Sequence, residues 1–480
     1  MANDCEPSAP RPRQSTPTGR FPTLATRTTP SDLERNASLD GIHHRNGDEF
    51  ETLASIDPYR LTQILRKNEQ AVIVGGGTGV LRYDTNQIAS NRPIEDDHSE
   101  AIIAAPSRSP GKSSGDWMFW GVYDGHSGWA TSAKLRQSLI AHVYRKLAKT
   151  YTSSATPSNS DIDNAIKAGF VALDNEIVWS NVERAKKLGS RHAGAQLLAP
   201  AISGSCALLS FYDTQSKLLR VACTGDCRAV LGRRAVTKWT ATQLSSDQTG
   251  ENPSEAARVT AAHPGEKDVV KNGRVLGCEP SRVFGDAVLK WPQEVSMALR
   301  RAFYARRPSS KVITPPYMTA EPVITTTKMK PERGDFIVLA SDALWEMLSN
   351  EQVVGIVGRW IDQGYLHLNK GIDPKPPSFW DRIYWGPNEL DSNVKPAALP
   401  QSEGPFRRLP VRPTQWGIAN RTRVLMMQDV NVATHIARNA LGGDDHDLIS
   451  SFFLQGGSNS RRYRDDLTVT VVFFGYDEFR

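Results

Sequence analysis

The sequence predicts an α+β fold in which two antiparallel sheets pack together and helices lie outside them. Two segments with apolar residues at helical spacing come first, and short apolar strands separated by turn residues follow them. A hydrophobic content of 39% over 480 residues, with 11 Trp and 15 Phe, is sufficient for a large core. Blocks of this kind bury one face of each sheet against the other sheet and the second face under helices.

The two predicted helices are neighbours in the sequence. The first covers 129–149 and the second is centred on 162–177, and in both the apolar residues recur every three or four positions. The residues that mark the two apolar faces are Leu135, Leu139, Val143 and Leu147, and Ile162, Ile166, Phe170, Leu173 and Ile177. Each segment therefore reads as an amphipathic helix with one face directed to the core.

Three short strands are expected after the helices, at 201–211, 218–223 and 229–231. The turn residues Asp213-Thr214 and Gly225-Asp226 separate them, so an antiparallel meander is predicted. The apolar runs at 119–123, 335–341 and 467–474 are predicted to be further buried strands.

Composition divides the chain into regions. The first 36 residues contain six Pro and nine Ser or Thr, and we predict a disordered segment at 1–50, followed by one catalytic domain at 51–480. Nine prolines and three tryptophans at 363–425 predict an insertion in that domain. This insertion is either a surface segment packed by its own aromatic residues or a docking or regulatory loop.

Charge and cysteine content exclude several classes of protein. The net charge of +6 and the pI near 9.0 come without a dense Lys/Arg block, which argues against nucleic-acid binding. We find no run of 18 apolar residues, so no transmembrane segment is expected.

The five cysteines lack C-x-x-C spacing and are expected to be reduced thiols. Cys206 and Cys223 lie in strand patterns and are expected in the core.

The segment Phe119–Gly128 places a carboxylate and an imidazole two residues apart, where an apolar run ends. Asp124 and His126 would be delivered at the carboxyl end of a buried strand. Gly125 and Gly128 free the backbone, so that a main-chain carbonyl can approach a cation closely. The pattern is typical of a hard-metal site, although an isolated motif of this kind is equally compatible with a solvated turn.

Three other carboxylate groups lie beside predicted strands. Glu95-Asp96-Asp97 is the first, Asp342 and Glu346 follow the apolar run that ends at 341, and Asp465-Asp466 directly precede the run at 467–474. Carboxylates beside buried strands are costly unless a cation or hydrogen-bond donors neutralise them. The four groups together therefore predict a shared metal site.

The four carboxylate-bearing segments, in their order along the chain, resemble those of the metal-dependent serine/threonine protein phosphatases of type 2C. Supporting matches are the segments 203–207, 224–229, 244–248 and 282–286. Within that family the chain is similar to the catalytic subunits of the pyruvate dehydrogenase phosphatases, on residues 61–69, 83–88, 93–96, 431–440 and 463–466. The resemblance covers residue 57 to the C-terminus and implies a four-layer α-β-β-α sandwich, with two antiparallel sheets flanked by helices.

The resemblance also implies two Mg²⁺ or Mn²⁺ ions in the active site and a third, weaker ion. Asp124 would bridge the first two ions. The other implied ligands are Asp342 and Asp465 for one ion, Glu95 and the Gly125 carbonyl for the other, and Asp226 and Glu346 for the third.

Two further roles follow from the same resemblance. His126 is the expected general acid for the leaving alkoxide, with Asp96 as a candidate to orient it or a metal-bound water. Many members of the family carry an Arg four residues before the metal-binding Glu, where this chain has Asn91; Arg92 is the expected substitute that grips phosphate. Ala343 stands where Gly is common, which is tolerable if its φ is negative.

The expected activity is hydrolysis of phosphoserine and phosphothreonine in proteins by a metal-bridging water. The subfamily resemblance implies the phosphorylated E1 component of the pyruvate dehydrogenase complex as the substrate, reactivation of that complex, and a mitochondrial matrix location. Arg11, Arg13, Arg20 and Arg27 fit a mitochondrial presequence, whereas the acidic residues and prolines nearby do not, so a cytoplasmic location is the alternative.

Other functions remain open on the sequence. The change at Asn91 and the insertion are compatible with a phosphoprotein-binding pseudophosphatase. A type 2C phosphatase with other substrates is the second alternative. Another two-metal hydrolase, such as a nuclease, is disfavoured because no basic groove pattern is present.

Overall fold

The fold was analysed in a computed structural model. It describes residues 56–106, 115–154, 156–235, 238–303, 305–366, 405–419, 426–454 and 457–476, together with the strand residues 384–385, 394–396 and 423–424. The predicted disordered segment at 1–50 and much of the predicted insertion at 363–425 lie outside the described residues. Everything below concerns the unit that begins at Ser55.

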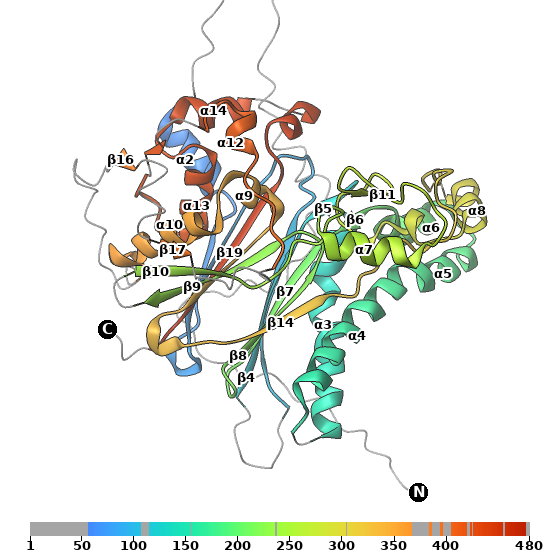
Figure 1. Ribbon diagram of the computed structural model, residues 1–480, viewed down its shortest axis with the longest axis horizontal. Helices are drawn as coiled ribbons and strands as arrows, with labels where there is room; N and C mark the ends of the chain where they lie inside the picture. The colour runs from blue at the N-terminus through green and yellow to red at the C-terminus, as the bar shows by residue number, and fades with distance from the viewer. Residues whose placement is uncertain are drawn as a thin grey trace, which may run out of the picture. The chain divides into compact units, whose positions relative to one another are not determined.

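The larger sheet has the strand order β1-β2-β19-β15-β9-β10-β17 (Figure 1). Its strands are β1 (Gln70–Ile73), β2 (Val80–Ile88), β9 (Arg228–Ala235), β10 (Lys238–Gln243), β15 (Phe336–Ala340), β17 (Val394–Pro396) and β19 (Leu467–Phe474). Neighbouring strands are antiparallel, except that β17 pairs in parallel with β10.

The second sheet is antiparallel throughout and has the order β14-β8-β7-β4-β3. Its strands are β3 (Asp97–Ala104), β4 (Asp116–Tyr123), β7 (Ala207–Asp213), β8 (Leu218–Thr224) and β14 (Val323–Lys328). Three short strands form a separate small sheet, namely β5 (Gly125–His126), β6 (Gly204–Ser205) and β13 (Phe284–Gly285). Two two-stranded pairs are β11 (Val270–Lys271) with β12 (Arg274–Val275), and β16 (Tyr384–Trp385) with β18 (Arg423–Val424).

The two main sheets pack face to face through a shared apolar core. In β4, Met118 and Trp120 point to this core, where they meet Leu208 of β7 and Ile337 of β15. Their neighbour Phe119 belongs instead to the core under the helices on the other face of the sheet. The alternation along β4 is the period of two that a strand imposes, and both faces of β4 are buried.

Helices cover both outer faces, as Figure 1 shows. Over the second sheet lie α3 (Ala130–Ser153) and α4 (Asn159–Asn175). The helices α5 (Asn181–Lys187), α6 (Arg191–Ile202) and α8 (Gln293–Phe303) extend this core beyond the sheet, and the π-helical turn η2 (Glu176–Ser180) lies between α4 and α5. Over the larger sheet lie α2 (Pro58–Arg66), α9 (Asp342–Met347), α10 (Asn350–Asp362), α13 (Val432–Leu441) and α14 (His446–Leu454). The predicted α+β sandwich of four layers is confirmed.

Shorter elements complete the fold. They are α7 (Pro253–Ala262), α12 (Arg412–Gln415) and the turns η1 (Gly76–Thr78), η3 (Ala287–Leu289), η4 (Pro331–Arg333) and η7 (Gly457–Arg462). Cys206 and Cys223 are buried in the core between the sheets, as expected, and the described cysteines are free thiols. Over the described ranges, no helix combines the length and apolarity needed to cross a bilayer.

The predicted meander is wrong at both ends. Residues 201–202 end helix α6 instead of starting a strand, and β9 leaves the sheet of β7 and β8 to pair with β15 in the larger sheet. Gly225, with a φ of 100°, turns the chain between β8 and β9. The crossing carries Asp226 past the edge where the two sheets meet, which a local strand pattern cannot indicate.

Candidate metal centre

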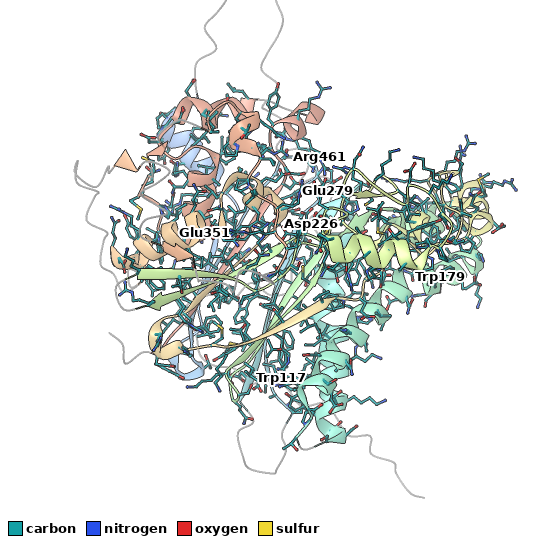
Figure 2. The ribbon with its side chains drawn as sticks, in the orientation of Figure 1. Trp117, Trp179, Asp226, Glu279, Glu351 and Arg461 are labelled. Atoms are coloured by element: carbon teal, nitrogen blue, oxygen red, sulfur yellow. The ribbon has the colours of Figure 1, made fainter. Side chains whose placement is uncertain are left out.

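Strand ends from both sheets meet at one edge of the sandwich. In the second sheet, the end of β4 lies beside the starts of β3 and β7, because Tyr123 pairs with Asp97 and Val122 pairs with Leu208. In the larger sheet, Ala340 at the end of β15 pairs with Val469 of β19 and with Arg228 of β9. Carboxylates far apart in the sequence therefore meet here, and Figure 2 shows Asp226 at this edge and Trp117 at the opposite end of β4.

Three carboxylates lie at the centre of this edge. Asp124, Asp226 and Asp342 each offer an oxygen, and these oxygens all lie within 4.8 Å of one another. Among the described residues, no Lys, Arg or His nitrogen makes an ion pair with any of the three. We call these three together with Asp96 and Asp465 the acidic cluster.

The ionised form of the acidic cluster is disfavoured in the protein alone. Burial raises the pKa of Asp124 and of Asp342 well above the usual range, and the neighbouring carboxylates raise both further. Burial also raises the pKa of Asp226 to about 6. Hard oxygen donors of this kind, with no ion pair to the three central carboxylates among the described residues, fit Mg²⁺ or Mn²⁺ and do not fit zinc.

Asp96 belongs to the same cluster. Its side chain is buried, one oxygen accepts a hydrogen bond from Thr468 Oγ1 at 2.7 Å, and the other has no partner among the described residues. Burial raises its pKa well above the usual range, and Asp466 and Asp465 add to the effect. Asp96 therefore faces the cluster, and no hydrogen bond to His126 supports the predicted orienting role.

Glu95 lies against the turn that follows β4. Its carboxylate accepts hydrogen bonds from the Gly128 N–H at 2.8 Å and from Arg461 Nη1 at 2.9 Å. A Cβ atom at Gly125 would collide with the Glu95 carbonyl oxygen. Glycine at 125 is thus required for the close approach of these two segments, whichever atoms hold a cation.

Asp465 and Asp466 have different partners although they are adjacent. Asp465 lies 3.5 Å from Arg461 Nη2 at the edge of the acidic cluster. Asp466 is buried and accepts hydrogen bonds from the backbone N–H groups of Ser90, Asn91 and Glu95. Asp466 therefore holds the loop that positions Glu95, whereas Asp465 is available to the cluster.

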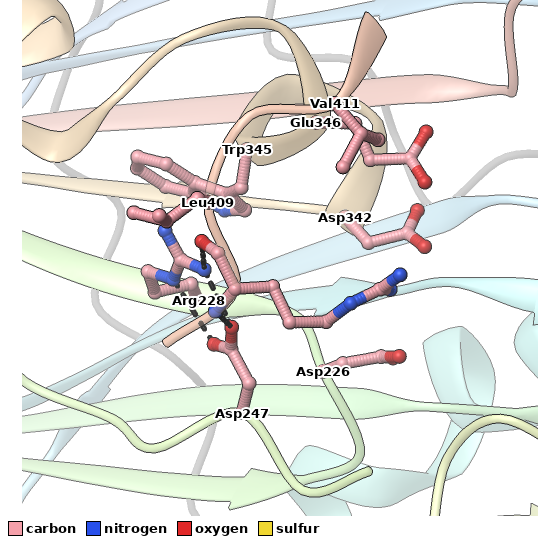
Figure 3. A pocket seen from close by; sticks show the side chains of 9 residues that line it. Asp226, Arg228, Asp247, Asp342, Trp345, Glu346, Leu409 and Val411 are labelled. Carbon is pink, nitrogen blue, oxygen red and sulfur yellow. Dashed lines mark hydrogen bonds and ion pairs between the residues drawn. The ribbon is translucent and has the colours of Figure 1, made fainter. Parts of the chain in front are cut away.

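Glu346 lies one helical turn after Asp342 on α9 and is paired with Arg412 at 2.7 Å. Arg412 belongs to the segment 405–412, which closes one side of a pocket next to the acidic cluster (Figure 3). The residues that line this pocket are Asp226, Arg228, Asp247, Asp342, Trp345, Glu346, Arg408, Leu409 and Val411. The pocket is thus lined both by two predicted ligands of the third ion, Asp226 and Glu346, and by residues within the predicted insertion at 363–425.

The segment 405–412 is held in place by backbone hydrogen bonds. Asp247 accepts from the Arg408 N–H at 2.8 Å, Arg228 donates to the Arg408 carbonyl at 3.0 Å, and the Val411 N–H donates to the Glu346 carbonyl at 2.9 Å. The buried pair of Arg228 and Asp247 forms the wall behind it, as the dashed lines in Figure 3 show. The Arg408 side chain pairs with Glu279 and Glu251 at the rim.

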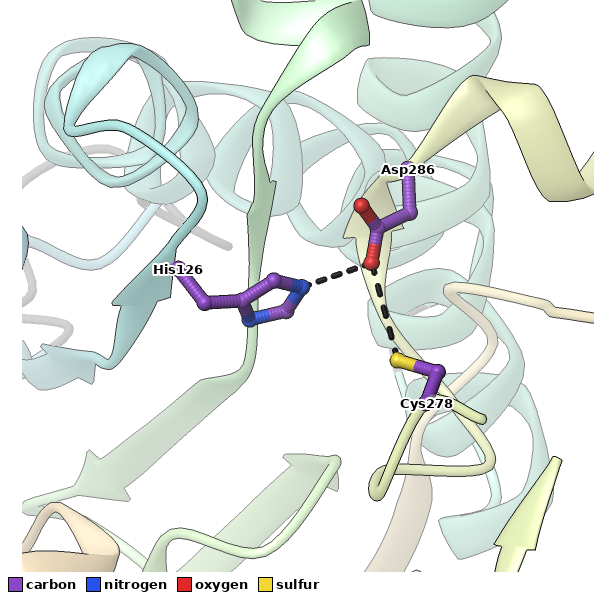
Figure 4. Close-up of side chains that lie close together, drawn as sticks. All are labelled: His126, Cys278 and Asp286. Carbon is purple, nitrogen blue, oxygen red and sulfur yellow. Dashed lines mark hydrogen bonds and ion pairs between the residues drawn. The ribbon is translucent and has the colours of Figure 1, made fainter. Parts of the chain in front are cut away.

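His126 is paired with Asp286, the last residue of the matching segment 282–286, for which the sequence predicted no role. Its Nε2 lies 2.6 Å from Asp286 Oδ2 (Figure 4). In the small sheet, His126 and Gly285 both pair with Gly204, which brings Asp286 beside the imidazole. Burial alone lowers the pKa of His126, but the charge and hydrogen bond of Asp286 outweigh it and raise that pKa above the ordinary value. Asp286, instead of Asp96, orients the ring.

Arg92, the residue predicted to grip phosphate, makes no ion pair with a carboxylate of the acidic cluster among the described contacts. Asn91 donates its amide to Asp466 at 2.8 Å, and Arg92 is exposed. The arginine that reaches Glu95 and Asp465 is Arg461, in η7. No motif marks Arg461, since it is one of several arginines just before β19, and only its spatial position distinguishes it. Ala343 lies within α9, so its methyl group meets no strain from a positive φ.

Comparison with known proteins gives a consistent result. A sequence model of the family described as Protein phosphatase 2C matches residues 88–374. A protein named as a protein phosphatase 2C homologue in Schizosaccharomyces pombe is 41% identical, over 86% of this chain and 84% of its own length. The mitochondrial protein named pyruvate dehydrogenase (acetyl-transferring) phosphatase 1 is 40% identical in Saccharomyces cerevisiae, over 86% of this chain and 72% of its own length. The human protein of that name is 28% identical, over 87% of this chain and 83% of its own length.

Proposed function

The chain belongs to the protein phosphatase 2C family and is a serine/threonine protein phosphatase, and we propose that it dephosphorylates the E1 component of the pyruvate dehydrogenase complex. The observation that carries the catalytic part of this proposal is the group of Asp124, Asp226 and Asp342, whose oxygens converge within 4.8 Å at one edge of the sandwich. Phosphatases of this family depend on metal ions, and the acidic cluster is the place in the described chain that suits them.

We assign two Mg²⁺ or Mn²⁺ ions to the centre and a third, weaker ion beside it. When bound, they supply an activated water and neutralise the phosphoryl oxygens. Asp124 would provide a ligand to both main ions. The remaining assignments are Asp342 and Asp465 for one ion, Glu95 and the Gly125 carbonyl for the other, and Asp226 and Glu346 for the third.

His126 is the proposed proton donor to the leaving serine or threonine oxygen. Asp286 accepts the Nε2 hydrogen bond at 2.6 Å and favours the protonated ring, so that a proton is available near neutral pH. Asp286 itself acts through His126 and is a positioning residue.

Arg461 is the cation that we assign to the phosphoryl group. Its guanidinium lies between Glu95 and Asp465, which are assigned to different ions, and its side chain is 42% exposed. A guanidinium fork at this place can donate to two phosphoryl oxygens. Arg92 remains the alternative from the sequence, although its side chain is exposed and it precedes a proline.

The substrate assignment rests on the names of the relatives. Two of them are named as pyruvate dehydrogenase phosphatases of mitochondria, and the similarity spans most of this chain. We therefore propose the phosphorylated E1 component as the substrate and the mitochondrial matrix as the location. A phosphatase with other protein substrates, in the matrix or the cytoplasm, is the alternative.

Phosphate release from phosphorylated E1 is the experiment that tests this function. We expect release that requires added Mg²⁺ or Mn²⁺, that is lost in Asp124→Asn, and that is unchanged in Asp268→Asn, whose side chain is 64% exposed. Release from a general phosphopeptide but not from E1 would overturn the substrate assignment alone. Binding of metal and phosphopeptide without any release would overturn the enzyme and favour a pseudophosphatase.

A further inference from the structure

His126, Cys278 and Asp286 form a second group of metal-ligating side chains beside the acidic cluster (Figure 4). The Asp286 Oδ2 atom lies 2.6 Å from His126 Nε2 and 3.8 Å from Cys278 Sγ. One ligand atom from each residue lies within 4.8 Å of the other two. The phosphatase chemistry proposed above uses His126 and Asp286 but gives Cys278 no role.

The backbone holds the three residues independently of any ligand. His126 and Asp286 are set by the small sheet, where a Cβ atom at Gly204 would collide with the imidazole. Cys278 closes a tight turn in which Val275 and Cys278 exchange two backbone hydrogen bonds of 2.8 and 2.9 Å. Leu276 and Gly277 in that turn have φ values of 49° and 96°. The ligand set is therefore preformed.

The chemistry of this group differs from that of the acidic cluster. The acidic cluster offers only oxygen atoms, whereas this group offers one imidazole nitrogen, one thiol sulfur and one carboxylate oxygen. Nitrogen and sulfur ligands favour zinc over magnesium or manganese, and three protein ligands leave a fourth tetrahedral position open. The two neighbouring groups therefore select different cations.

We propose that His126, Cys278 and Asp286 bind a zinc ion, and that this ion inhibits the phosphatase. A zinc ion at this place coordinates His126 Nε2 in place of its proton, so the ring can no longer form the imidazolium that would supply a proton to the leaving group. The zinc ion also binds the Asp286 carboxylate that orients the ring, so neither His126 nor Asp286 can then serve the proton transfer. The inhibitory consequence rests on the proposed function, whereas the zinc site itself does not.

A redox role for Cys278 is the competing interpretation of this group. Burial raises the pKa of the Cys278 thiol well above the usual range, and the charge of Asp286 adds to this. A protonated thiol is a poor nucleophile, and among the described cysteines none is disulfide-bonded. The three ligand atoms lie within 4.8 Å of one another, and this geometry favours a metal ligand, whose thiol proton a doubly charged cation displaces.

Cobalt substitution tests the site without relying on activity. Co²⁺ bound by a thiolate has a charge-transfer absorption in the near ultraviolet, which oxygen ligands alone do not produce. We expect this band in the wild-type chain and in Asp124→Asn, where the acidic cluster is impaired, and we expect Cys278→Ser to lose it. The matched control is Cys223→Ser, a buried cysteine whose thiol lies near backbone carbonyls. A band that persists in Cys278→Ser, or that requires Asp124, would overturn the proposal.

Zinc inhibition of the manganese-loaded enzyme tests the consequence. Cys278→Ser should keep the basal activity, because Cys278 does not touch the acidic cluster in the described contacts, and should need at least about tenfold more zinc for half inhibition. Cys278→Ala should behave in the same way, and circular dichroism checks that both variants are folded. Equal zinc sensitivity of the wild type and both variants would show that zinc acts elsewhere. If the wild type releases no phosphate, the cobalt result still decides the site.

Discussion

Two buried groups of charged side chains differ in charge compensation: in one group each charge is paired with an opposite charge, and in the other the carboxylates face one another. Below α13, Arg82 pairs with Asp84 through two hydrogen bonds of 2.6 and 2.8 Å, and Arg438 pairs with Asp429 through two of 2.7 and 3.0 Å. All four side chains are buried. In the acidic cluster, Asp124 and the aspartates around it are also largely buried, but they face one another. We call the first group the α13 pairs.

The difference separates a structural role from a functional one. Each charge of the α13 pairs has an opposite charge within the chain, so the pairs join β2 and α13 without any further ligand. The acidic cluster lacks such a partner at its centre, and its neutralisation requires a cation from outside the chain. Uncompensated buried charge is therefore the more informative sign of a site than buried charge itself.

Asp124→Asn should show the largest effect. We expect phosphatase activity to fall by roughly a thousandfold or more, because Asp124 is the proposed shared ligand of two cations and each cation would contribute several kcal/mol. The same change removes repulsion within the acidic cluster, so the metal-free variant should unfold at a temperature at least as high as the wild type does. Calorimetry of Mn²⁺ binding and thermal unfolding without metal measure the two effects. A metal-free variant that is clearly less stable would break the comparison.

Arg438→Met tests the opposite case. Removal of one partner from a buried pair leaves Asp429 uncompensated, and we expect a loss of about 3–5 kcal/mol in the free energy of unfolding. Denaturant unfolding measures this loss. The double variant Arg438→Met with Asp429→Leu should recover much of it, because neither charge is then buried. An unchanged stability of the single variant would mean that the α13 pairs do not hold this part of the fold.

The buried His435 on α13 is expected to make the free energy of unfolding fall at acidic pH. It is buried, its Nε2 has no partner among the described residues, and burial lowers its pKa to about 4. The unfolded chain takes up this proton near pH 6.5, so stability present above pH 6.5 is lost as the pH falls toward 4, by about 3 kcal/mol in total.

Urea unfolding of the wild type and of His435→Leu at several pH values measures this loss. The variant should lack that part of the pH dependence. Identical pH dependence in the two proteins would show that His435 is protonated in the folded state or that other groups dominate.

Arg461→Ala should have the smallest effect, at the exposed end of the acidic cluster. We expect KM for a phosphopeptide to rise roughly tenfold to a hundredfold, corresponding to about 1.5–3 kcal/mol, with a smaller change in kcat. Arg92→Ala is the matched arginine removal and should change little. Isothermal titration with inorganic phosphate in the presence of Mn²⁺ gives the same comparison without turnover. The reverse result, a loss in Arg92→Ala alone, would return the phosphate contact to Arg92.

Much of the fold could be predicted from local patterns. The apolar repeat of the helix predicted at 129–149 corresponds to α3, whose residues Leu135, Leu139, Val143 and Leu147 are fully buried. The runs before Asp124 and Asp342 are strands β4 and β15, because alternation and strand length are properties of neighbouring residues. The strand predicted at 229–231 exists as β9, but its place in the meander was wrong, because β9 pairs with β15, which is distant in the sequence.

Some residues of the candidate site could likewise be predicted from the sequence, and others could not. The acidic residues were recognisable because each follows or precedes an apolar run. The role of Asp286, the role of Arg461 and the pairing of Cys278 with Asp286 were not, because each depends on contacts between segments that are distant in the sequence or carry no motif of their own. The sequence likewise indicated Asp465 over Asp466 only through the resemblance, whereas the backbone hydrogen bonds to Asp466 give a physical reason.

The sequence by itself determined the class of fold, the family and the set of acidic side chains, because these depend on residue type and on the local period of apolar residues. Only the tertiary structure decided which of the charges are compensated and which are not. Ionic interactions depend on separation in space, and the two packed sheets bring together Asp124, Asp226 and Asp342 from three distant parts of the chain. The partners in the α13 pairs lie only two and nine residues apart in the sequence, and the packing buries these pairs, whereas the packing alone brings the carboxylates of the acidic cluster together.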